Sequence, residues 1–254
     1  MPDESPATRT NRAWWNASSP QYQADHEREL EGDLLWGPSM PPERDLRILG
    51  SSVEGKDILD VACGGGQSAV YLAEQGARVV GVDFSSAQLE HARAFAESRK
   101  AQVRFIESNA EDLAALVDGS FDIAVSAYAL GIVEDIRRTF REIHRVLRPN
   151  GLFAFSWMSP LFAITEPNGL RIIRSYFDRT PIVYHEKEGV ETDFHRTYGD
   201  WHKALTDAGF VVSDIVEPEP IPQENTYADG FPLAKIRMIP GTTIWRSGKS
   251  SADE

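Results

Sequence analysis

The chain has 254 residues, 41% of them hydrophobic, which suits one α/β domain with additions rather than two full domains. Its formal net charge of −13 disfavours nucleic acid as a partner, because binding a phosphate backbone needs a cationic surface. No apolar run approaches the roughly 20 residues of a membrane span, and the polar N-terminus lacks the apolar stretch of a secretory signal. We therefore expect a cytoplasmic protein, a monomer or homodimer, that binds neither nucleic acid nor a membrane.

Residues 1–50 precede the first predicted strand and are expected to form an N-terminal helical cap. Residues 1–10 are polar and are expected to be frayed. The rest of the cap contains aromatic side chains between acidic residues: Trp14, Trp15, Tyr22 and Trp36. This aromatic content without a strand pattern favours a lid that covers a ligand site. The alternative is plain packing, which apolar residues at helical spacing often serve.

The stretch from Asp57 to Gly66 is the most informative part of the sequence. A short apolar strand ends on Asp60 and runs into three consecutive glycines, and a second apolar run ends on Asp83 about 20 residues later. Glycines after a strand let the backbone approach a ligand, and an acid that ends the next strand can accept from ribose hydroxyls. The pattern predicts an adenosine-binding crevice at the carboxyl edge of a parallel sheet.

Two adenosine cofactors fit this crevice. Gly64, Gly66 and Ala69 satisfy the Gly-x-Gly-x-x-Gly/Ala spacing of dinucleotide folds, so the glycines alone are weak evidence. Asp60 is more informative, because its carboxylate suits an ammonium group and repels a pyrophosphate. S-adenosylmethionine carries an ammonium and a sulfonium and no phosphate, so the acid favours the methyl donor over a nicotinamide dinucleotide.

The following elements continue an alternation of strands and helices. Strands are predicted near residues 103–107, 121–127 and 152–157, with a helix over 134–147 before the last of them. Residues 159–197 are expected to be an insertion after the fifth strand. A helix over 199–208 and strands over 210–217 and 238–246 follow, and residues 247–254 are expected to be a tail. The connection over 217–237, with four prolines, is long for a compact domain.

Taken together, these motifs resemble the class I S-adenosylmethionine-dependent methyltransferases. The resemblance rests on residues 59–64, 81–83, 109–112 and 147–151, and it is closest to the branch of ubiquinone and menaquinone biosynthesis enzymes. The C-terminal part is similar to an actinobacterial-type subgroup that acts on small molecules. The resemblance implies a Rossmann-like, mostly parallel sheet of seven strands ordered 3-2-1-4-5-7-6, flanked by helices, in a methyltransferase domain over residues 51–246. Ala62 and Asn109 depart from the family, which usually has Gly and often Asp there.

The predicted cofactor-binding residues follow from these motifs and from the resemblance. Asp60, Gly64 and Gly66 are expected to seat the methionine end, and Asp83 is expected to hold the ribose. Asn109 and Ala110 are expected at the adenine edge. The full set is Tyr22, Trp36, Asp60, Ala62, Gly64, Gly66, Asp83, Phe84, Gln88, Asn109, Ala110, Glu111 and Ser126.

Three residues are candidates for catalysis. His195, at the end of the insertion, and His26, four residues after Tyr22, are candidate general bases, because imidazole titrates near neutral pH. Tyr128 follows the fourth strand, where the cofactor and the acceptor would meet. We expect no metal, because the sequence shows no ligand cluster of the kind that metal-dependent O-methyltransferases use.

The sequence therefore predicts an enzyme that transfers a methyl group from S-adenosylmethionine to a small, planar or aromatic acceptor by in-line displacement. A cofactor-binding partner subunit without activity and an NAD(P)-dependent reductase are the alternatives.

Overall fold

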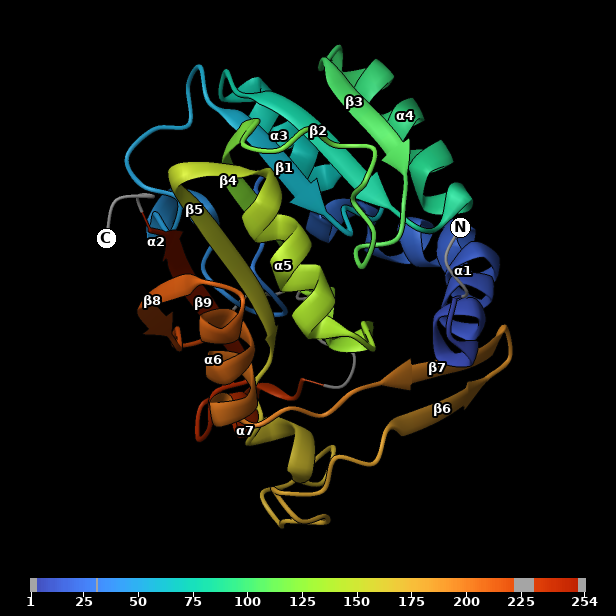
Figure 1. The fold of residues 1–254 in the computed structure, drawn as a ribbon. Coiled ribbons are helices and arrows are strands. Elements are labelled where there is room, and N and C mark those ends of the chain that lie inside the picture. The colour runs from blue at the N-terminus through green and yellow to red at the C-terminus, as the bar shows by residue number, and fades with distance from the viewer. Residues whose placement is uncertain (1–3, 31, 222–230, 251–254) are drawn as a thin grey trace.

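A central sheet of seven strands dominates the computed structural model, which describes residues 4–30, 32–221 and 231–250 (Figure 1). The strand order is β3-β2-β1-β4-β5-β9-β8, in which β1 to β5 run parallel and β9 runs antiparallel between β5 and β8. The strands are β1 (Asp57–Val61), β2 (Arg78–Asp83), β3 (Val103–Glu107), β4 (Phe121–Ser126), β5 (Leu147–Met158), β8 (Phe210–Val216) and β9 (Thr242–Lys249). The predicted fold and the predicted strand order 3-2-1-4-5-7-6 are confirmed. The labels differ only because the separate hairpin of β6 and β7 precedes the last two strands of the sheet.

Helices cover both faces of the sheet. On one face, α5 (Ile136–Val146) and α6 (Tyr198–Asp207) pack over β4, β5 and β9, and the ring of Phe140 lies 5.3 Å from that of Phe155. On the other face, α3 (Gln67–Glu74) packs beside α4 (Ser86–Arg99), and the N-terminal segment over residues 34–53 completes the core. Because both faces are covered, ligands can reach the sheet only at its edges and strand ends.

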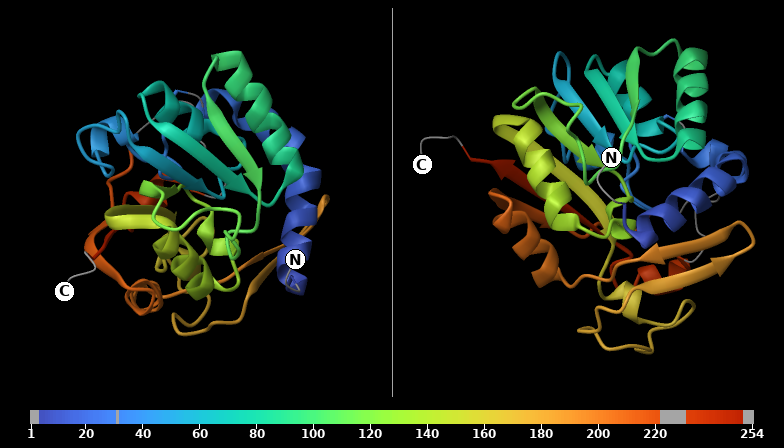
Figure 2. Two further views of the ribbon diagram at one scale, coloured as in Figure 1. Left: turned by 45° about the horizontal axis from the view of Figure 1, so that its top comes forward. Right: turned by 45° about the vertical axis from the view of Figure 1, so that its right-hand side comes forward.

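The segment predicted as a cap contains α1 (Pro6–Leu30) and the short α2 (Glu43–Leu46). Helix α1 begins within the residues expected to be frayed, so that expectation is wrong from Pro6 onward. A second unit, the hairpin of β6 (Ile182–Glu186) and β7 (Gly189–Asp193), lies against α1 (Figure 2). Together α1 and the hairpin lie beyond the carboxyl ends of β1, β2 and β4.

The C-terminal part differs from the sequence prediction in its bounds. Strand β9 extends to Lys249, so the expected tail begins inside the sheet, where pairing with β5 and β8 satisfies the backbone. Short elements complete the chain: η1 (Leu130–Ile132), η2 (Phe162–Ile164) and α7 (Leu233–Ile236). Part of the proline-containing connection, including Pro222, lies outside the described residues.

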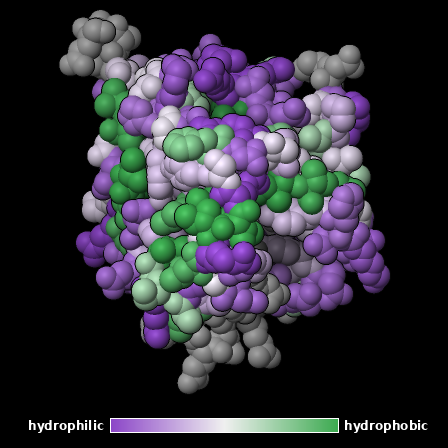
Figure 3. All heavy atoms as spheres, turned by 90° about the horizontal axis from the view of Figure 1, so that it is seen from below, coloured by the Kyte–Doolittle hydropathy of each residue, from purple (hydrophilic) through white to green (hydrophobic). Residues whose placement is uncertain are grey.

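Figure 3 shows hydrophobic residues gathered among hydrophilic ones on the face seen from below the view of Figure 1. The segment after β5 carries exposed apolar side chains. They include Leu161, Leu170, Ile172, Ile173, Phe177 and Val183. Across the described ranges, no helix combines the length and the apolar character needed to cross a membrane.

Candidate functional site

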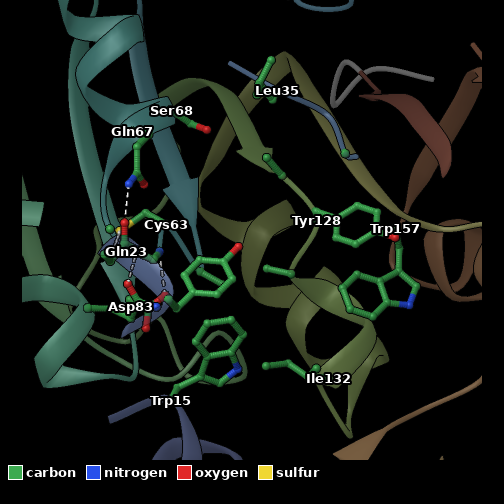
Figure 4. Close-up of a pocket in the computed structure, with 18 of the residues that line it drawn as sticks. Trp15, Gln23, Leu35, Cys63, Gln67, Ser68, Asp83, Tyr128, Ile132 and Trp157 are labelled. Atoms are coloured by element: carbon green, nitrogen blue, oxygen red, sulfur yellow. Dashed lines mark hydrogen bonds between the residues drawn. The ribbon is translucent and has the colours of Figure 1, made fainter. Parts of the chain in front are cut away.

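A cavity of about 420 Å³ opens at the carboxyl ends of β1, β2 and β4, enclosed by α1 and the β6–β7 hairpin (Figure 4). In Figure 4 Cys63, Asp83 and Gln23 lie on one side, Tyr128 and Trp157 lie on the other, and Trp15 lies between the two groups. Its volume falls within the range of small-molecule sites. The two sides differ in chemistry. On one side polar groups and the backbone of the glycine turn line the cavity, and on the other side aromatic rings line it.

The polar side is a tight turn after β1. Gly64 and Gly66 have positive φ angles of 51° and 81°, and Ala62 also lies in the left-handed region at 55°. This backbone explains why a glycine is usual where Ala62 stands, since a Cβ is disfavoured in that region. The Gly64 N–H donates to Asp83 Oδ2 at 2.9 Å, and the Ser85 N–H donates to Asp83 Oδ1 at 2.8 Å. Asp83 therefore ties the glycine turn to the start of α4.

Two buried carboxyl groups meet at this turn. Burial, together with the nearby charge of Asp83, raises the pKa of Asp60 to about 8, and Asp60 Oδ2 has no hydrogen-bond partner among the described residues. Burial raises the pKa of Asp83 to about 6, against the lowering effect of N–H donors from Ser85, Gly64 and Phe84. A buried carboxylate oxygen without a partner is costly, so the turn fits a ligand that brings a positive charge or a donor.

Helix α1 is joined to the core by polar side chains that the sequence analysis did not single out. Gln23 donates to Gln88 Oε1 at 2.7 Å and accepts from Gln67 Nε2 at 2.6 Å, so it spans the glycine turn. Asn16 Oδ1 accepts from the Ser85 hydroxyl at 2.8 Å. An amide in a helix gives no sequence signal of this kind, because its partners lie more than 40 residues away along the chain.

Aromatic rings form the remaining wall. Trp15 contacts Tyr22 edge-to-face with ring centroids 5.3 Å apart, and Trp14 contacts Trp15 at 4.9 Å. Across the cavity, the ring of Tyr128 lies 4.9 Å from that of Trp157. Of the three residues predicted to be catalytic, only Tyr128 lines the main cavity.

The predicted adenine-edge residues border a smaller neighbouring cavity of about 30 Å³. Asn109, Ala110 and Glu111 line it, and Asp83 and Phe84 line both cavities. Asn109 Oδ1 accepts from the Glu111 N–H at 3.0 Å, which fixes the turn after β3. The turns after β2 and β3 therefore bring these side chains to the same edge of the sheet.

Trp36, Asp60, Gly66 and Ser126 of the predicted cofactor set do not line the described cavities. Trp36 is completely buried in the core, where its indole N–H donates to Glu43 Oε2 at 2.8 Å. Ser126 ends β4 and is also fully buried. Gly66 begins α3, and a Cβ there would lie 2.8 Å from the Ala92 Cβ, so its role is close packing of α3 against α4.

The two candidate histidines also lie away from the main cavity. His195 is 7% exposed and borders a separate cavity of about 30 Å³, where its Nε2 lies 3.0 Å from the Tyr176 carbonyl oxygen. Burial lowers the pKa of His195, opposed by that carbonyl. His26 Nδ1 lies 2.7 Å from the Tyr22 carbonyl oxygen, outside the residues that line the main cavity. Their positions argue against either histidine as the base that faces an acceptor.

The β6–β7 hairpin contributes side chains that the sequence analysis missed. Tyr184, Glu186, Glu191 and Asp193 all line the main cavity. The available signal was the two-residue spacing within each strand, which puts each pair on one face. His195, the residue that the sequence analysis singled out, lies just past this hairpin and does not line the main cavity.

Known proteins share both the sequence motifs and this architecture. A family model described as "Methyltransferase domain" matches residues 59–155. The uncharacterized methyltransferase YbaJ of Bacillus subtilis is 29% identical over 177 residues, which are 65% of this chain and 69% of that protein. A ubiquinone biosynthesis O-methyltransferase of Vibrio campbellii is 37% identical over 54% of this chain and 61% of its own length.

A solved structure extends the similarity beyond the matched domain. The S-adenosylmethionine-dependent methyltransferase from Mesorhizobium loti is 29% identical, with a TM-score of 0.66, and the alignment covers 81% of this chain and 96% of that one. The cofactor named for that protein suits a cavity lined by the glycine turn and Asp83. Residues 59–155 therefore match a methyltransferase domain, and the fold and these relatives support a class I S-adenosylmethionine-dependent methyltransferase.

Proposed function

We propose that the chain methylates a small, planar or aromatic organic acceptor without a metal. The observation that carries this proposal is a single cavity with a glycine turn and Asp83 on one side and aromatic rings on the other. The polar side suits the cofactor and the aromatic side suits a flat acceptor. The Vibrio relative is named as an O-methyltransferase of ubiquinone biosynthesis, which is consistent with a ring-containing acceptor.

On the cofactor side, Asp83 would accept from the ribose hydroxyls with the lone pairs that Gly64 and Ser85 leave free. Asp60 would supply the negative charge for the ammonium group, and Asn109 with Ala110 would lie at the adenine edge. Bound S-adenosylmethionine supplies an electrophilic methyl group. Phe84, which lines both cavities, would cover one face of the base.

On the acceptor side, the chain acts mainly by orientation and by exclusion of water. Trp15 and Tyr22 from α1 face Tyr128 and Trp157 from the core, so a flat acceptor would lie between rigid rings. Holding two reactants in line in a dry pocket can supply a large part of a rate enhancement. We propose Tyr128 as an acceptor contact, since its ring lies in the wall at the end of β4.

The proposal is tested by cofactor binding. Calorimetry should show that S-adenosylhomocysteine binds in preference to NADH, since the acids Asp60 and Asp83 beside the glycine turn disfavour a pyrophosphate. Tighter binding of NADH would favour a reductase. Binding of S-adenosylhomocysteine with no methyl transfer to any of a broad set of small aromatic compounds would favour a partner subunit without activity.

Helix α1 is expected to close over bound ligand. Amide hydrogen exchange within residues 11–26 should slow when S-adenosylhomocysteine is added, because Gln23 and Asn16 join the helix to the turns that would contact the cofactor. Residues 198–207 in α6, on the face of the sheet covered by α5, serve as an internal control and should not change. Equal exchange in α1 with and without the ligand would mean that the helix is static packing.

A further inference from the structure

Four side chains of the hairpin share the face that lines the main cavity. Tyr184 pairs with Glu191 across the two strands, while Glu186 and Asp193 lie two residues further along their own strands. Successive side chains of a strand point to opposite faces, so these four point the same way, and all four line the cavity. The hairpin therefore presents three carboxyl groups and one phenol to the acceptor side.

The position of these carboxyl groups is set by α1. Asn11 accepts from the Thr192 N–H at 2.7 Å and donates to the Thr192 carbonyl oxygen at 3.0 Å. Asn11 also donates to the Ile132 carbonyl oxygen at 3.1 Å, which connects the hairpin to the turn after β4. Thr192 lies between Glu191 and Asp193. The contacts of Asn11 therefore hold the backbone that carries both acids against α1 and the turn after β4.

The charge of the cavity wall has one sign. Every charged residue among the described residues that line it is an acid: Asp33, Asp83, Glu186, Glu191 and Asp193. Asp33 is already paired with Arg44 at 2.8 Å, and Asp83 serves the glycine turn. Within the described residues, none of the three hairpin acids forms an ion pair with a basic side chain, and the Trp15 indole N–H is the donor that interacts with Glu191.

A nearby cation does not offset this charge by a direct contact. Arg196 donates to the carbonyl oxygens of Val133 and Glu134, and its guanidinium lies 5.0 Å from the centre of the Trp201 ring. Its charge lowers the pKa of Asp193, but burial outweighs this effect and raises the pKa of Asp193 to about 7. Burial, with the neighbouring Asp193 and Glu186, raises the pKa of Glu191 to about 8. Both groups are poised to ionise fully when a cation arrives.

We propose that the acceptor is an aromatic or planar compound that carries a cationic amine, held by Glu191 and Asp193 between the rings of Trp15, Tyr184 and Trp157. This inference rests on the proposed function and names its substrate class. Carboxylates supply charged hydrogen bonds to an ammonium group, and aromatic faces attract a cation further. An acceptor with a free carboxylate or phosphate would meet only acidic groups in this wall and would disfavour their ionisation.

A metal ion is a weaker explanation for the three acids. Within residues 4–30, 32–221 and 231–250, no group of three metal-ligating side chains is close enough to hold an ion. A neutral phenol or quinone would leave the acids without a partner in the bound state. A cationic amine can instead form charged hydrogen bonds with Glu191 and Asp193, which lie two residues apart on the same face of β7.

The test uses three probes of one shape that differ in charge: tryptamine, 3-methylindole and indole-3-propionate. Calorimetry on the protein saturated with S-adenosylhomocysteine should show tryptamine binding roughly tenfold or more tightly than 3-methylindole, with indole-3-propionate the weakest. The double variant Glu191→Gln/Asp193→Asn should lose the preference for tryptamine. Glu188→Gln, an exposed acid in the same hairpin that does not line the cavity, is the matched control and should keep it.

The outcomes separate the two proposals. If S-adenosylhomocysteine does not bind, the proposed function fails. If it binds but tryptamine gains nothing over 3-methylindole, does not bind, or keeps its preference in the double variant, the cationic acceptor is wrong. Unchanged affinity for S-adenosylhomocysteine in the double variant excludes a general loss of folding.

The preference for tryptamine is also expected to depend on pH. Its amine stays protonated below pH 9, while Glu191 and Asp193 gain protons as the pH falls through about 8 and 7, so affinity should decrease from pH 8.5 to pH 6. The charged and titratable groups around them are Glu186, Tyr184, Arg174, Arg196 and the Trp15 indole N–H. A flat profile between these pH values would contradict the assignment of the two acids.

Discussion

Replacing Asp83 by Asn is expected to weaken S-adenosylhomocysteine binding by roughly 10- to 150-fold. Both carboxylate oxygens accept backbone N–H groups, from Gly64 and Ser85, and their remaining lone pairs would accept from the ribose. An amide can place an oxygen at only one of these positions, and its NH₂ group opposes the N–H at the other. The variant therefore loses a charged acceptor for the ligand and also loosens the glycine turn.

Calorimetry measures this loss, and Glu107→Gln is the matched control. Glu107 ends β3 in register with Asp83, but its side chain is exposed, so its replacement should leave affinity unchanged. A thermal melt of Asp83→Asn distinguishes weaker binding from unfolding. Affinity within twofold of the natural sequence in a folded variant would remove Asp83 from the cofactor site.

Replacing Gly131 by Ala is expected to lower the free energy of unfolding by roughly 2–3 kcal/mol or more. A Cβ at this position would lie 1.7 Å from Trp157 Cε2, far inside a van der Waals contact, so the indole ring must move. The Gly131 carbonyl oxygen also accepts from the Phe194 N–H at 2.9 Å, which limits how far the backbone can retreat. Because Trp157 lines the main cavity, the same shift should weaken binding of a flat acceptor.

Chemical denaturation measures the change, and two variants make the cause specific. Gly248→Ala in β9 is the matched control, because a Cβ there meets no atom within 4 Å, and it should change stability little. Adding Trp157→Leu to Gly131→Ala should recover part of the lost stability by removing the clashing ring. If Gly131→Ala is as stable as the natural sequence, the packing of η1 against β5 is looser than the structure shows.

Local sequence patterns were sufficient for the parallel core. The apolar runs that become β1 and β2 end on Asp60 and Asp83, and the glycines between them permit positive φ angles at positions 64 and 66. These features depend on residues within about 30 positions of one another, so spacing alone predicts where the turn and the second acid meet. The order of the seven strands followed from the same motifs through the resemblance to a known family.

The composition of the acceptor side was decided by tertiary structure. Trp36 has the same aromatic character as Trp15, yet it packs into the core against Glu43 while Trp15 faces the cavity. His195 is the residue of the insertion that was predicted as a general base. Its ring lies against the Tyr176 carbonyl oxygen, whereas Glu191 and Asp193 line the cavity. For the hairpin side chains, the difference depends on the docking of β7 on α1 through Asn11, a contact across about 180 residues.

The sequence by itself determined the cofactor turn, because a strand, a glycine loop and a second acid are specified by neighbours along the chain. Only the tertiary structure decided which side chains line the rest of the cavity. A hairpin has two faces, and the face that turns inward depends on the surface against which it packs. The two hydrogen bonds between the Asn11 amide and the Thr192 backbone hold β7 against α1, and Glu191 and Asp193 lie in the wall of the cavity.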